Sequence, residues 1–352
     1  MDNTLNNKKP LPDFSYGTNN YIALMTSGGD APGMNMTIIS LLRFFYLKKW
    51  NVKVIYDGIV GLLNDEIKPF DFNEFHADTD HIFDSGTFIR SSRYPDFKLP
   101  QNVNKAVANL NKENIKLLII LGGDGSYHAA QLLMHHGINV IGLPATIDND
   151  VGSTDYTIGF NSALNLILQE IVAIRHTVKS FNSFCLIEVM GRECSDLSVC
   201  AALASFADAV ITRHNPWTKE DFVNQIKLIK SHNKNWGIFI VTEKFYGTQN
   251  YPSYNEIVSY VENELKLHMR FNSIGYAQRG ATPTASELVN CFKFAQYCVQ
   301  CIENNIYNVA LGIQKDELVH FDFDLAMQMQ KSDNLDEIKL IDLFRQLDYQ
   351  KH

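Results

Sequence analysis

The sequence lacks the features that mark several large classes of protein. Basic residues are in deficit, because 31 Lys and Arg stand against 39 Asp and Glu and the formal net charge is -8. Binding along a nucleic acid needs cations that neutralise phosphates, so this balance argues against a nucleic-acid partner. Apolar runs such as 117–121 are far shorter than the roughly 20 residues that span a bilayer, and the N-terminus has no apolar signal-peptide core. We therefore expect a cytoplasmic protein with no membrane partner.

Cysteine is also scarce, with six residues in a chain of 352. These cysteines lie inside apolar-periodic stretches, which argues against a disulfide framework and predicts reduced thiols. Cys298 and Cys301 form a C-x-x-C, but residues 286–305 carry apolar side chains at helical spacing. No second cysteine pair or nearby histidine completes a zinc set. Packing within a helix is therefore favoured over metal or redox chemistry for this pair.

What the sequence does contain is a repeated alternation of strand-like and helix-like segments. From Tyr21 onward, short β-branched runs alternate with longer amphipathic stretches, and a second series of the same kind begins after Gly159. Such alternation is typical of parallel βαβ units, whose buried strands need helices on both faces. The sequence therefore predicts an α/β protein with two doubly wound, Rossmann-like domains. Residues 1–20 are polar and aperiodic, and we expect them to form a flexible N-terminal arm.

Three predicted strand ends have an unusual composition. Residues 26–35 read TSGGDAPGMN, residues 122–126 read GGDGS, and residues 144–150 read PATIDND. None of these is a Walker A loop or a G-x-G-x-x-G. Glycine-rich turns can approach phosphate, an aspartate between them can hold Mg²⁺, and the pair Asp148 and Asp150 can accept a proton. Each segment alone is better explained as a tight turn or a helix cap, but their joint occurrence at the strand ends of one lobe favours phosphoryl transfer.

The motifs that extend this pattern are TSGGDAPGMN, SGTFIRSSRYPDF, LGGDGSYHAA, PATIDND, TDYTIGF, EVMGR, TEKF and IGYAQRGATP. In this order and spacing, from about Tyr21 to the C-terminal segment, the chain resembles the ATP-dependent 6-phosphofructokinases of bacterial type. The resemblance implies Mg-ATP-dependent conversion of fructose 6-phosphate to fructose 1,6-bisphosphate in glycolysis. It implies an ATP-binding domain of 21–159 plus about 278–328 and a sugar-phosphate-binding domain of 160–277 plus about 329–352, with a cleft between them. It also implies a homotetramer whose sites are shared between subunits.

The resemblance also implies roles for individual residues. Asp148 resembles the general base, Arg192 a transition-state cation, and Thr146 and Asp150 the residues that position the γ-phosphoryl and the sugar; Asp124 resembles the Mg²⁺ ligand. The implied ATP contacts are Gly29, Arg93, Tyr94, Asp124, Gly125 and Ser126. The implied sugar-phosphate contacts are Thr146, Asp148, Met190, Gly191, Arg192, Glu243, Arg270, Tyr276 and Arg279, of which Arg270 would reach the 6-phosphate in the next subunit. Surface ion pairing is the alternative interpretation of Arg270 and Arg279.

The phosphoryl donor depends on two small residues. Pyrophosphate-using relatives carry a second aspartate after GGD and a lysine before TIDND, and that carboxylate fills the space of the α-phosphate of ATP. This sequence has Gly125 and Ala145 at those positions. A small neutral pair leaves room for a nucleotide and adds no repulsion, so the sequence favours ATP.

Two departures affect the expected 6-phosphate pocket. Ser183 stands where the family has an arginine from the adjacent subunit, and Tyr276 stands where a histidine is expected. Charge-assisted hydrogen bonds are stronger than neutral ones, so we expect weaker substrate binding.

The effector site of the bacterial enzymes is also altered. Of the basic residues that the family uses there, Arg43, Arg175 and Lys234 have counterparts in this sequence. The other basic positions hold Ile39, Phe72 and His232, and His214 stands where the family has an acidic contact to Mg²⁺. We therefore expect the usual polyanionic effectors to bind poorly.

Two alternatives remain open at the level of sequence. One is a non-catalytic or regulatory paralogue in a hetero-oligomer, where a partner chain could supply the missing arginine. The other is a kinase for a different sugar phosphate. The presence of Asp148, Asp124, Arg93 and Arg192 favours catalysis, because a scaffold would not need them.

Overall fold

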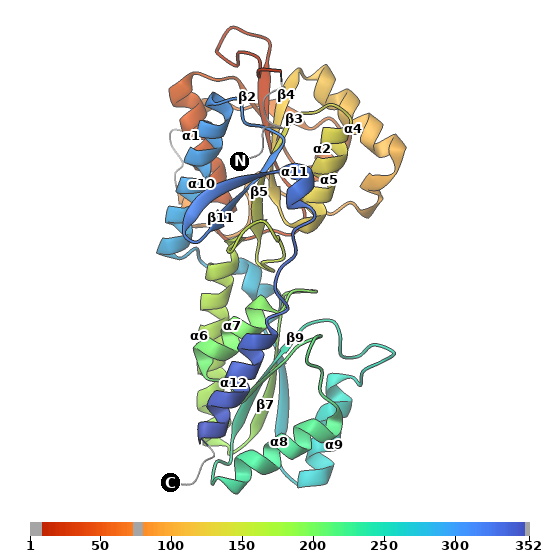
Figure 1. The fold of residues 1–352 in the computed structure, drawn as a ribbon, viewed down its shortest axis with the longest axis vertical. Helices are drawn as coiled ribbons and strands as arrows, with labels where there is room; N and C mark the ends of the chain where they lie inside the picture. Colours follow the sequence, from red (N-terminus) through yellow and green to blue (C-terminus); the bar gives the residue numbers. More distant parts are fainter. Residues whose placement is uncertain (1–8, 73–79, 349–352) are drawn as a thin grey trace. The chain divides into compact units, whose positions relative to one another are not determined.

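A computed structural model describes residues 9–72 and 80–348 (Figure 1). The chain forms two compact units. The first contains the described residues up to Thr146, together with Val151–Gly159 and Thr282–Gln330. The second contains Ile147–Asp150, Phe160–Ala281 and the described residues from Lys331 onward. Compared with the expected domains, the short segments 147–150 and 278–281 belong to the second unit and 329–330 to the first.

The first unit is built on an eight-stranded sheet with the order β12-β11-β5-β4-β1-β2-β3, and β6 pairs with β5. The strands are β1 Tyr21–Thr26, β2 Val52–Ile55, β3 Ile67–Pro69, β4 Ile115–Gly122, β5 Val140–Thr146, β6 Ile158–Gly159, β11 Val309–Gln314 and β12 Glu317–Asp322. Neighbouring strands run parallel except in the two edge pairs, β2 with β3 and β11 with β12. Strands β1 and β4 are almost wholly buried, as expected for parallel strands covered on both faces.

Helices cover both faces of this sheet (Figure 1). They are α1 Met34–Lys48, α2 Gly58–Leu63, α4 Pro100–Lys112, α5 Asp124–His135, α10 Ala285–Glu303 and the single turn α11 Phe323–Ala326, with 3₁₀ turns η2 Asp80–Phe83 and η3 Pro95–Lys98. Helices α1 and α10 lie together on one face, and α2, α4 and α5 lie on the other. Gly33 is the N-cap of α1 and has φ +89°, and a Cβ there would lie 2.7 Å from Cys291 Sγ in α10. Only glycine therefore allows this close approach.

The second unit has a four-stranded, fully parallel sheet with the order β10-β7-β9-β8. Its strands are β7 Phe184–Val189, β8 Ala209–Ile211, β9 Gly237–Thr242 and β10 Met269–Ser273. Its helices are α6 Phe160–Ser180, α7 Asp196–Ser205, α8 Lys219–Ser231, α9 Tyr254–Leu265 and α12 Leu335–Asp348, with the 3₁₀ helix η4 Gly275–Gly280. Thr218 and Ser253 close capping boxes at the starts of α8 and α9. The prediction of two parallel-sheet α/β domains is thus confirmed.

The expected N-terminal arm requires a correction in its described part. Residues 1–8 lie outside the described residues, but residues 9–20 pack on the first unit. Phe14 is buried, Ser15 forms a β-bridge with Trp50, and the Tyr307 hydroxyl donates to the Lys9 carbonyl at 2.6 Å. Because Phe14 removes a large apolar surface from water there, this part of the segment is not a free arm.

The six cysteines are free thiols, as predicted. Cys298 and Cys301 are buried in α10, and burial raises the pKa of Cys301 to about 12. A thiol held protonated in this way is a poor nucleophile and metal ligand. Among the described residues, no helix combines the length and apolar character needed to cross a bilayer.

Candidate active site

Three loops meet at the carboxyl edge of the first unit's sheet. Strands β5, β4 and β1 are consecutive neighbours, with Gly122 in register with Pro144 and Leu121 in register with Thr26. The segments 27–33, 122–126 and 144–146 therefore emerge side by side. Segments 26–33 and 122–126 and the first residues of PATIDND lie together in one unit, as expected, whereas residues 147–150, with Asp148 and Asp150, belong to the other unit. The carboxyl edge of an open α/β sheet is where ligands bind.

Ser126 lies at the centre of this edge, in the first turn of α5. It is 2% exposed, and its hydroxyl is buried without a hydrogen-bond partner in the described chain. A Cβ added to Gly28 would lie 3.2 Å from Ser126 Oγ, and one added to Gly122 would lie 2.2 Å from it. The absence of side chains at both glycines therefore makes room for this hydroxyl. A buried unpaired hydroxyl at a helix N-terminus is prepared to donate to an anion.

Asp124 and Gly125 precede Ser126 and have open surroundings. The Asp124 carboxylate is about half exposed in the first turn of α5, 3.6 Å from His128 Nε2. A Cβ added to Gly125 would meet no atom within 4 Å. The N-terminus of α5 is therefore open to a bound group at Asp124 and at Gly125.

The segment that carries Arg93 and Tyr94 is attached to the β1 end. The Gly28 N–H donates to the Ser92 carbonyl at 3.0 Å, and the Ser91 hydroxyl donates to the Gly28 carbonyl at 3.1 Å. Arg93 and Tyr94 follow directly with exposed side chains. Gly29, next to this anchor, is partly exposed. Arg93 is thus held beside the glycine turn, and among the described residues it forms no ion pair with a carboxylate.

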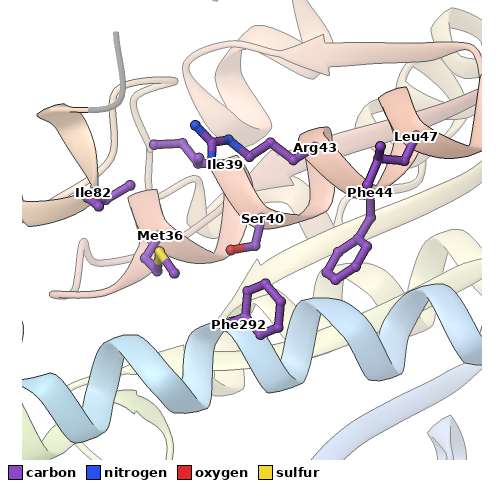
Figure 2. A pocket seen from close by; sticks show the side chains of 8 residues that line it. All are labelled: Met36, Ile39, Ser40, Arg43, Phe44, Leu47, Ile82 and Phe292. Atoms are coloured by element: carbon purple, nitrogen blue, oxygen red, sulfur yellow. The ribbon is translucent and has the colours of Figure 1, made fainter. Parts of the chain in front are cut away.

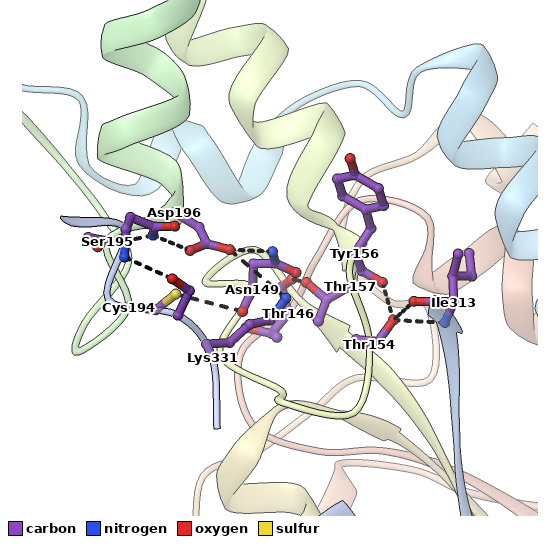
Figure 3. A network of polar contacts seen from close by, with 12 residues as sticks. Thr146, Asn149, Thr154, Tyr156, Thr157, Cys194, Ser195, Asp196, Ile313 and Lys331 are labelled. Atoms are coloured by element: carbon purple, nitrogen blue, oxygen red, sulfur yellow. Dashed lines mark hydrogen bonds and ion pairs between the residues drawn. The ribbon is translucent and has the colours of Figure 1, made fainter. Parts of the chain in front are cut away.

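Thr146 ends β5 in the first unit. Its carbonyl accepts a 2.6 Å hydrogen bond from the Thr157 hydroxyl, while Thr154 accepts from the Ile313 N–H at 2.9 Å (Figure 3). A Cβ on Gly123 would lie 3.0 Å from the Thr146 Cβ. The Thr157 bond fixes the end of β5, and the missing side chain at Gly123 leaves room for Thr146 beside the start of α5.

The next four residues, Ile147–Asp150, belong to the second unit and carry the two predicted aspartates. Asp148 is 2% exposed, and its Oδ2 lies 3.4 Å from Arg192 Nε. Asp150 is partly exposed. The predicted base and the predicted cation are therefore neighbours, and the guanidinium is placed to stabilise negative charge beside the Asp148 carboxylate.

Arg192 is presented by a tight turn after β7. Gly191 has φ +137°, and a Cβ there would lie 2.5 Å from the Cys194 carbonyl, so only glycine fits. The Met190 N–H donates to Gln278 Oε1 at 3.0 Å, and Glu243, which follows β9, donates its N–H to the Val189 carbonyl at 2.9 Å. Met190, Arg192 and Glu243 thus share the carboxyl edge of the second sheet. Sequence reasoning missed Gln278 as a support of this turn.

The remaining predicted sugar contacts differ in position. Arg279 is buried in η4, close to Gln278, whereas Tyr276 is 83% exposed. Arg270 lies in β10 in register with Cys185, four residues before the end of β7, and its guanidinium is 3.8 Å from Glu262 Oε1. Arg270 is therefore not brought to the carboxyl edge of its own sheet.

A magnesium ion is compatible with the first unit. Within residues 9–72 and 80–348, no group of three or more His, Cys, Asp and Glu side chains is placed to hold a metal. Mg²⁺ in nucleotide sites keeps several waters and takes one or two carboxylates plus phosphate oxygens. Asp124, half exposed and two residues before Ser126 in the first turn of α5, offers one such carboxylate.

The fold and this edge define an α/β protein with two parallel-sheet units and glycine-containing loops at the carboxyl ends of its strands. The family model for phosphofructokinase matches residues 21–302. The chain therefore belongs to the phosphofructokinase family, which confirms the resemblance seen in the sequence.

Two bacterial relatives are similar to this chain along most of their own length. The probable ATP-dependent 6-phosphofructokinase of Mycoplasma pneumoniae is 38% identical over 90% of this chain and 95% of its own. The ATP-dependent 6-phosphofructokinase of Teredinibacter turnerae is 38% identical over 87% of this chain and 93% of its own. The solved phosphofructokinase of Saccharomyces cerevisiae is 26% identical with a TM-score of 0.78, covering 94% of this chain. That of Pichia pastoris in the T-state is also 26% identical, with a TM-score of 0.81 over 96% of this chain. This chain spans 48% and 40% of those two yeast chains.

Proposed function

We propose that this protein is an ATP-dependent 6-phosphofructokinase that transfers the γ-phosphoryl group of ATP to the 1-hydroxyl of fructose 6-phosphate. ATP binds the first unit, through Gly29, Arg93, Tyr94, Asp124, Gly125 and Ser126. Fructose 6-phosphate binds the second unit, through Asp148, Met190, Gly191, Arg192 and Glu243. The proposal is supported by membership of the phosphofructokinase family and by the ATP-dependent enzymes among its relatives.

The observation that carries this proposal is the buried Ser126 hydroxyl between Gly28 and Gly122. A buried hydroxyl without a partner is costly unless a ligand completes it. Backbone N–H groups and the α5 dipole favour an anion at the same point. A nucleotide phosphate supplies the acceptor oxygens, and Mg²⁺ held by Asp124 would neutralise the charge of those phosphates.

The second unit supplies the acid–base chemistry. As the sugar 1-oxygen bonds to the γ-phosphorus and the bond to the ADP oxygen breaks, Asp148 accepts the hydroxyl proton. Arg192, 3.4 Å from that carboxylate, neutralises charge that grows on the transferring group. Thr146 and Asp150 flank the base in sequence and position the γ-phosphoryl and the sugar.

The acceptor is tested by measuring ADP release from ATP with a panel of sugar phosphates. We expect fructose 6-phosphate to give the highest kcat/KM. A higher value for another sugar phosphate would replace the proposed acceptor while leaving the kinase chemistry in place.

We propose further that the protein works as a homotetramer with shared sites. Arg270 and Ser183 both lie toward the amino side of the second sheet, because Ser183 directly precedes β7 and Arg270 is in register with Cys185. Met190 and Glu243 follow the opposite, carboxyl ends. A parallel strand of six residues is about 20 Å long, and this separation from the carboxyl edge supports the proposal that Arg270 and Ser183 serve a neighbouring subunit. A mixed oligomer with a second paralogue would use the same surface.

The substitution Ser183→Arg tests the altered 6-phosphate pocket. Restoring a cation that reaches the neighbouring subunit is expected to lower the KM for fructose 6-phosphate by roughly tenfold, the effect of about 1.4 kcal/mol. Ser183 is 6% exposed, so thermal melting is recorded alongside the kinetics to detect a cost of the larger side chain.

Lys179→Ala is the comparison for this substitution. Lys179 Nζ lies 5.4 Å from the Trp236 ring centroid, near the start of β7. If Ser183→Arg leaves KM unchanged or raises it while Lys179→Ala is severely damaging, Lys179 already supplies the missing charge. If neither change matters, the natural acceptor is a different sugar phosphate.

The face of α1 near the expected effector site is apolar. A pocket of about 500 Å³ is lined mainly by apolar side chains, among them Ile39, Phe44 and Phe292, and Arg43 also lines it (Figure 2). Phe72 also packs its ring on Tyr46, with centroids 5.1 Å apart. Walls of this kind offer few donors to a polyanion.

Two further basic residues at the expected effector positions, Arg175 and Lys234, form polar contacts within the second unit. Arg175 donates to the Phe206 carbonyl at 3.1 Å, and Lys234 pairs with Asp208. Both cations also lie over the Trp236 ring. They are therefore less available to a ligand than free surface cations.

We accordingly expect millimolar phosphoenolpyruvate to leave the saturation curve for fructose 6-phosphate nearly unmoved, and ADP to act only as a product that competes with ATP. A working allosteric site typically couples by about 1–3 kcal/mol, a shift of several-fold or more. Steady-state kinetics with and without phosphoenolpyruvate measure this. A clear rightward shift would mean that the remaining basic groups suffice for an effector.

A further inference from the structure

The carboxylate of Asp196 joins two distant segments of the second unit. Its Oδ2 accepts a hydrogen bond of 2.6 Å from Asn149 Nδ2, and its Oδ1 accepts one of 2.6 Å from Asn334 Nδ2. Figure 3 shows the first of these bonds, with Lys331 nearby. Lys331 Nζ lies 4.0 Å from Asp196 Oδ2. Both carboxylate oxygens are thus used, one toward the loop 147–150 and one toward the start of α12.

The loop side of this contact fixes an unusual backbone conformation. Asn149 lies between Asp148 and Asp150, is buried, and has φ +54°. Asparagine tolerates this left-handed region better than most residues but still needs support from its surroundings. That support comes from the side-chain bond to Asp196 and from the Cys194 thiol, whose Sγ is 3.7 Å from the Asn149 carbonyl oxygen. The direction of Asp148 therefore depends on how Asn149 is held.

The other side of the contact rests on the C-terminal helix. Asn334 has φ +57° immediately before α12, and its Nδ2 also donates to the Ser195 hydroxyl at 3.2 Å. Helix α12 packs on α7 and β8, with Ile338 and Ile341 buried. Asp196 itself is the first residue of α7, where the helix dipole favours a carboxylate. The Asp196 carboxylate at the start of α7 is thus held by the loop 147–150 through Asn149 and by the segment before α12 through Asn334.

We propose that Asp196 is a positioning residue that holds the loop 147–150 for catalysis, and that the C-terminal segment takes part through Asn334. This inference rests on the proposed function, because that function assigns proton transfer to Asp148. Asp196 does not touch the reacting atoms; it acts through Asn149. Loss of the contact should therefore reduce turnover more than substrate affinity.

The first test is steady-state kinetics of Asp196→Ala in the full chain. We expect kcat to fall roughly 10- to 100-fold, the size of effect that a small misplacement of a catalytic group produces, while the KM for ATP stays within about twofold. Asp196→Asn keeps the size but only one of the two acceptor oxygens, so one of the amide donors, Asn149 Nδ2 or Asn334 Nδ2, loses its partner. Its kcat should therefore fall, but less than that of Asp196→Ala. Asn334→Ala removes the contact from the C-terminal side and should lower kcat in the same direction.

Asp336→Ala is the matched control. Asp336 lies two residues after Asn334, and its side chain is 93% exposed, so its removal should change neither kcat nor KM. If Asp196→Ala does not fold, Asp196→Asn and Asn334→Ala carry the test. Unchanged kcat in folded Asn334→Ala and Asp196→Ala, or a change confined to KM, overturns the proposal.

Hydrogen–deuterium exchange separates this inference from the proposed function. Peptides that contain residues 147–150 should exchange faster in Asp196→Ala and Asn334→Ala than in the wild type or in Asp336→Ala. This readout does not require turnover. If the wild type fails to phosphorylate fructose 6-phosphate, the proposed function is wrong, and faster loop exchange still supports Asp196 as the support of the loop. Equal exchange rates in all variants overturn it.

Discussion

Replacing Asp148 by Asn is expected to lower kcat by roughly 10²- to 10⁴-fold, the range that a general base contributes, with little change in ATP affinity. The substitution keeps the size of the side chain but removes the oxygen that accepts the sugar proton. Asp148 is buried beside Arg192, so solvent has little access to replace it as the base. ATP affinity should be preserved because the proposed ATP contacts lie in the other unit. Coupled ADP-release kinetics at saturating substrates measure the loss.

Asp155→Asn serves as the control for this change. Asp155 lies seven residues further along the chain and is exposed, so its neutralisation should leave kcat nearly unchanged. The assignment of the base fails if Asp148→Asn keeps more than about half of the wild-type turnover.

Gly125→Asp is expected to reduce kcat/KM for ATP by at least roughly 100-fold, which corresponds to about 2.8 kcal/mol. A Cβ at residue 125 meets no atom within 4 Å, so the side chain fits and the fold should be retained. The new carboxylate would lie beside Ser126, where the proposal places the phosphates of ATP, and close like charges cost several kcal/mol. The wild type should in turn use ATP and not pyrophosphate as the donor.

Gly125→Asn is the matched control, because it has the same shape without the charge. It should lose much less activity than Gly125→Asp, and equal thermal midpoints would show that neither change unfolds the protein. Efficient turnover of the wild type with pyrophosphate would overturn the interpretation of this position, and so would a Gly125→Asp variant that uses ATP normally.

Long, buried strands were easier to predict from the sequence than very short strands or partly exposed edge strands. Strands such as β1 and β4 are continuous apolar runs followed by glycine turns, and that pattern is visible without a structure. Strand β6 has two residues and β3 has three, too short for any period to appear. Strand β12 is a partly exposed edge strand paired antiparallel to β11, and its mixed burial gives no clear alternation.

The site was predictable where chemistry depends on local motifs. The loops at 26–35, 122–126 and 144–150 carry their glycines and aspartates in short stretches, and neighbouring parallel strands bring the strand ends together. The contacts of Asp196 were not predictable, because its partners Asn149 and Asn334 lie 47 and 138 residues away. Gln278, which supports Met190 from 88 residues away, was missed for the same reason. Such partners follow from tertiary packing, which no local pattern encodes.

The most direct measurement is the reaction of the purified chain alone with Mg-ATP and fructose 6-phosphate, followed by phosphorus NMR of the product. The account predicts stoichiometric formation of ADP and fructose 1,6-bisphosphate, which is abolished when fructose 6-phosphate is omitted and strongly reduced in Asp148→Asn. Absence of fructose 1,6-bisphosphate in the wild-type reaction, under conditions in which a known 6-phosphofructokinase forms it, would contradict the account.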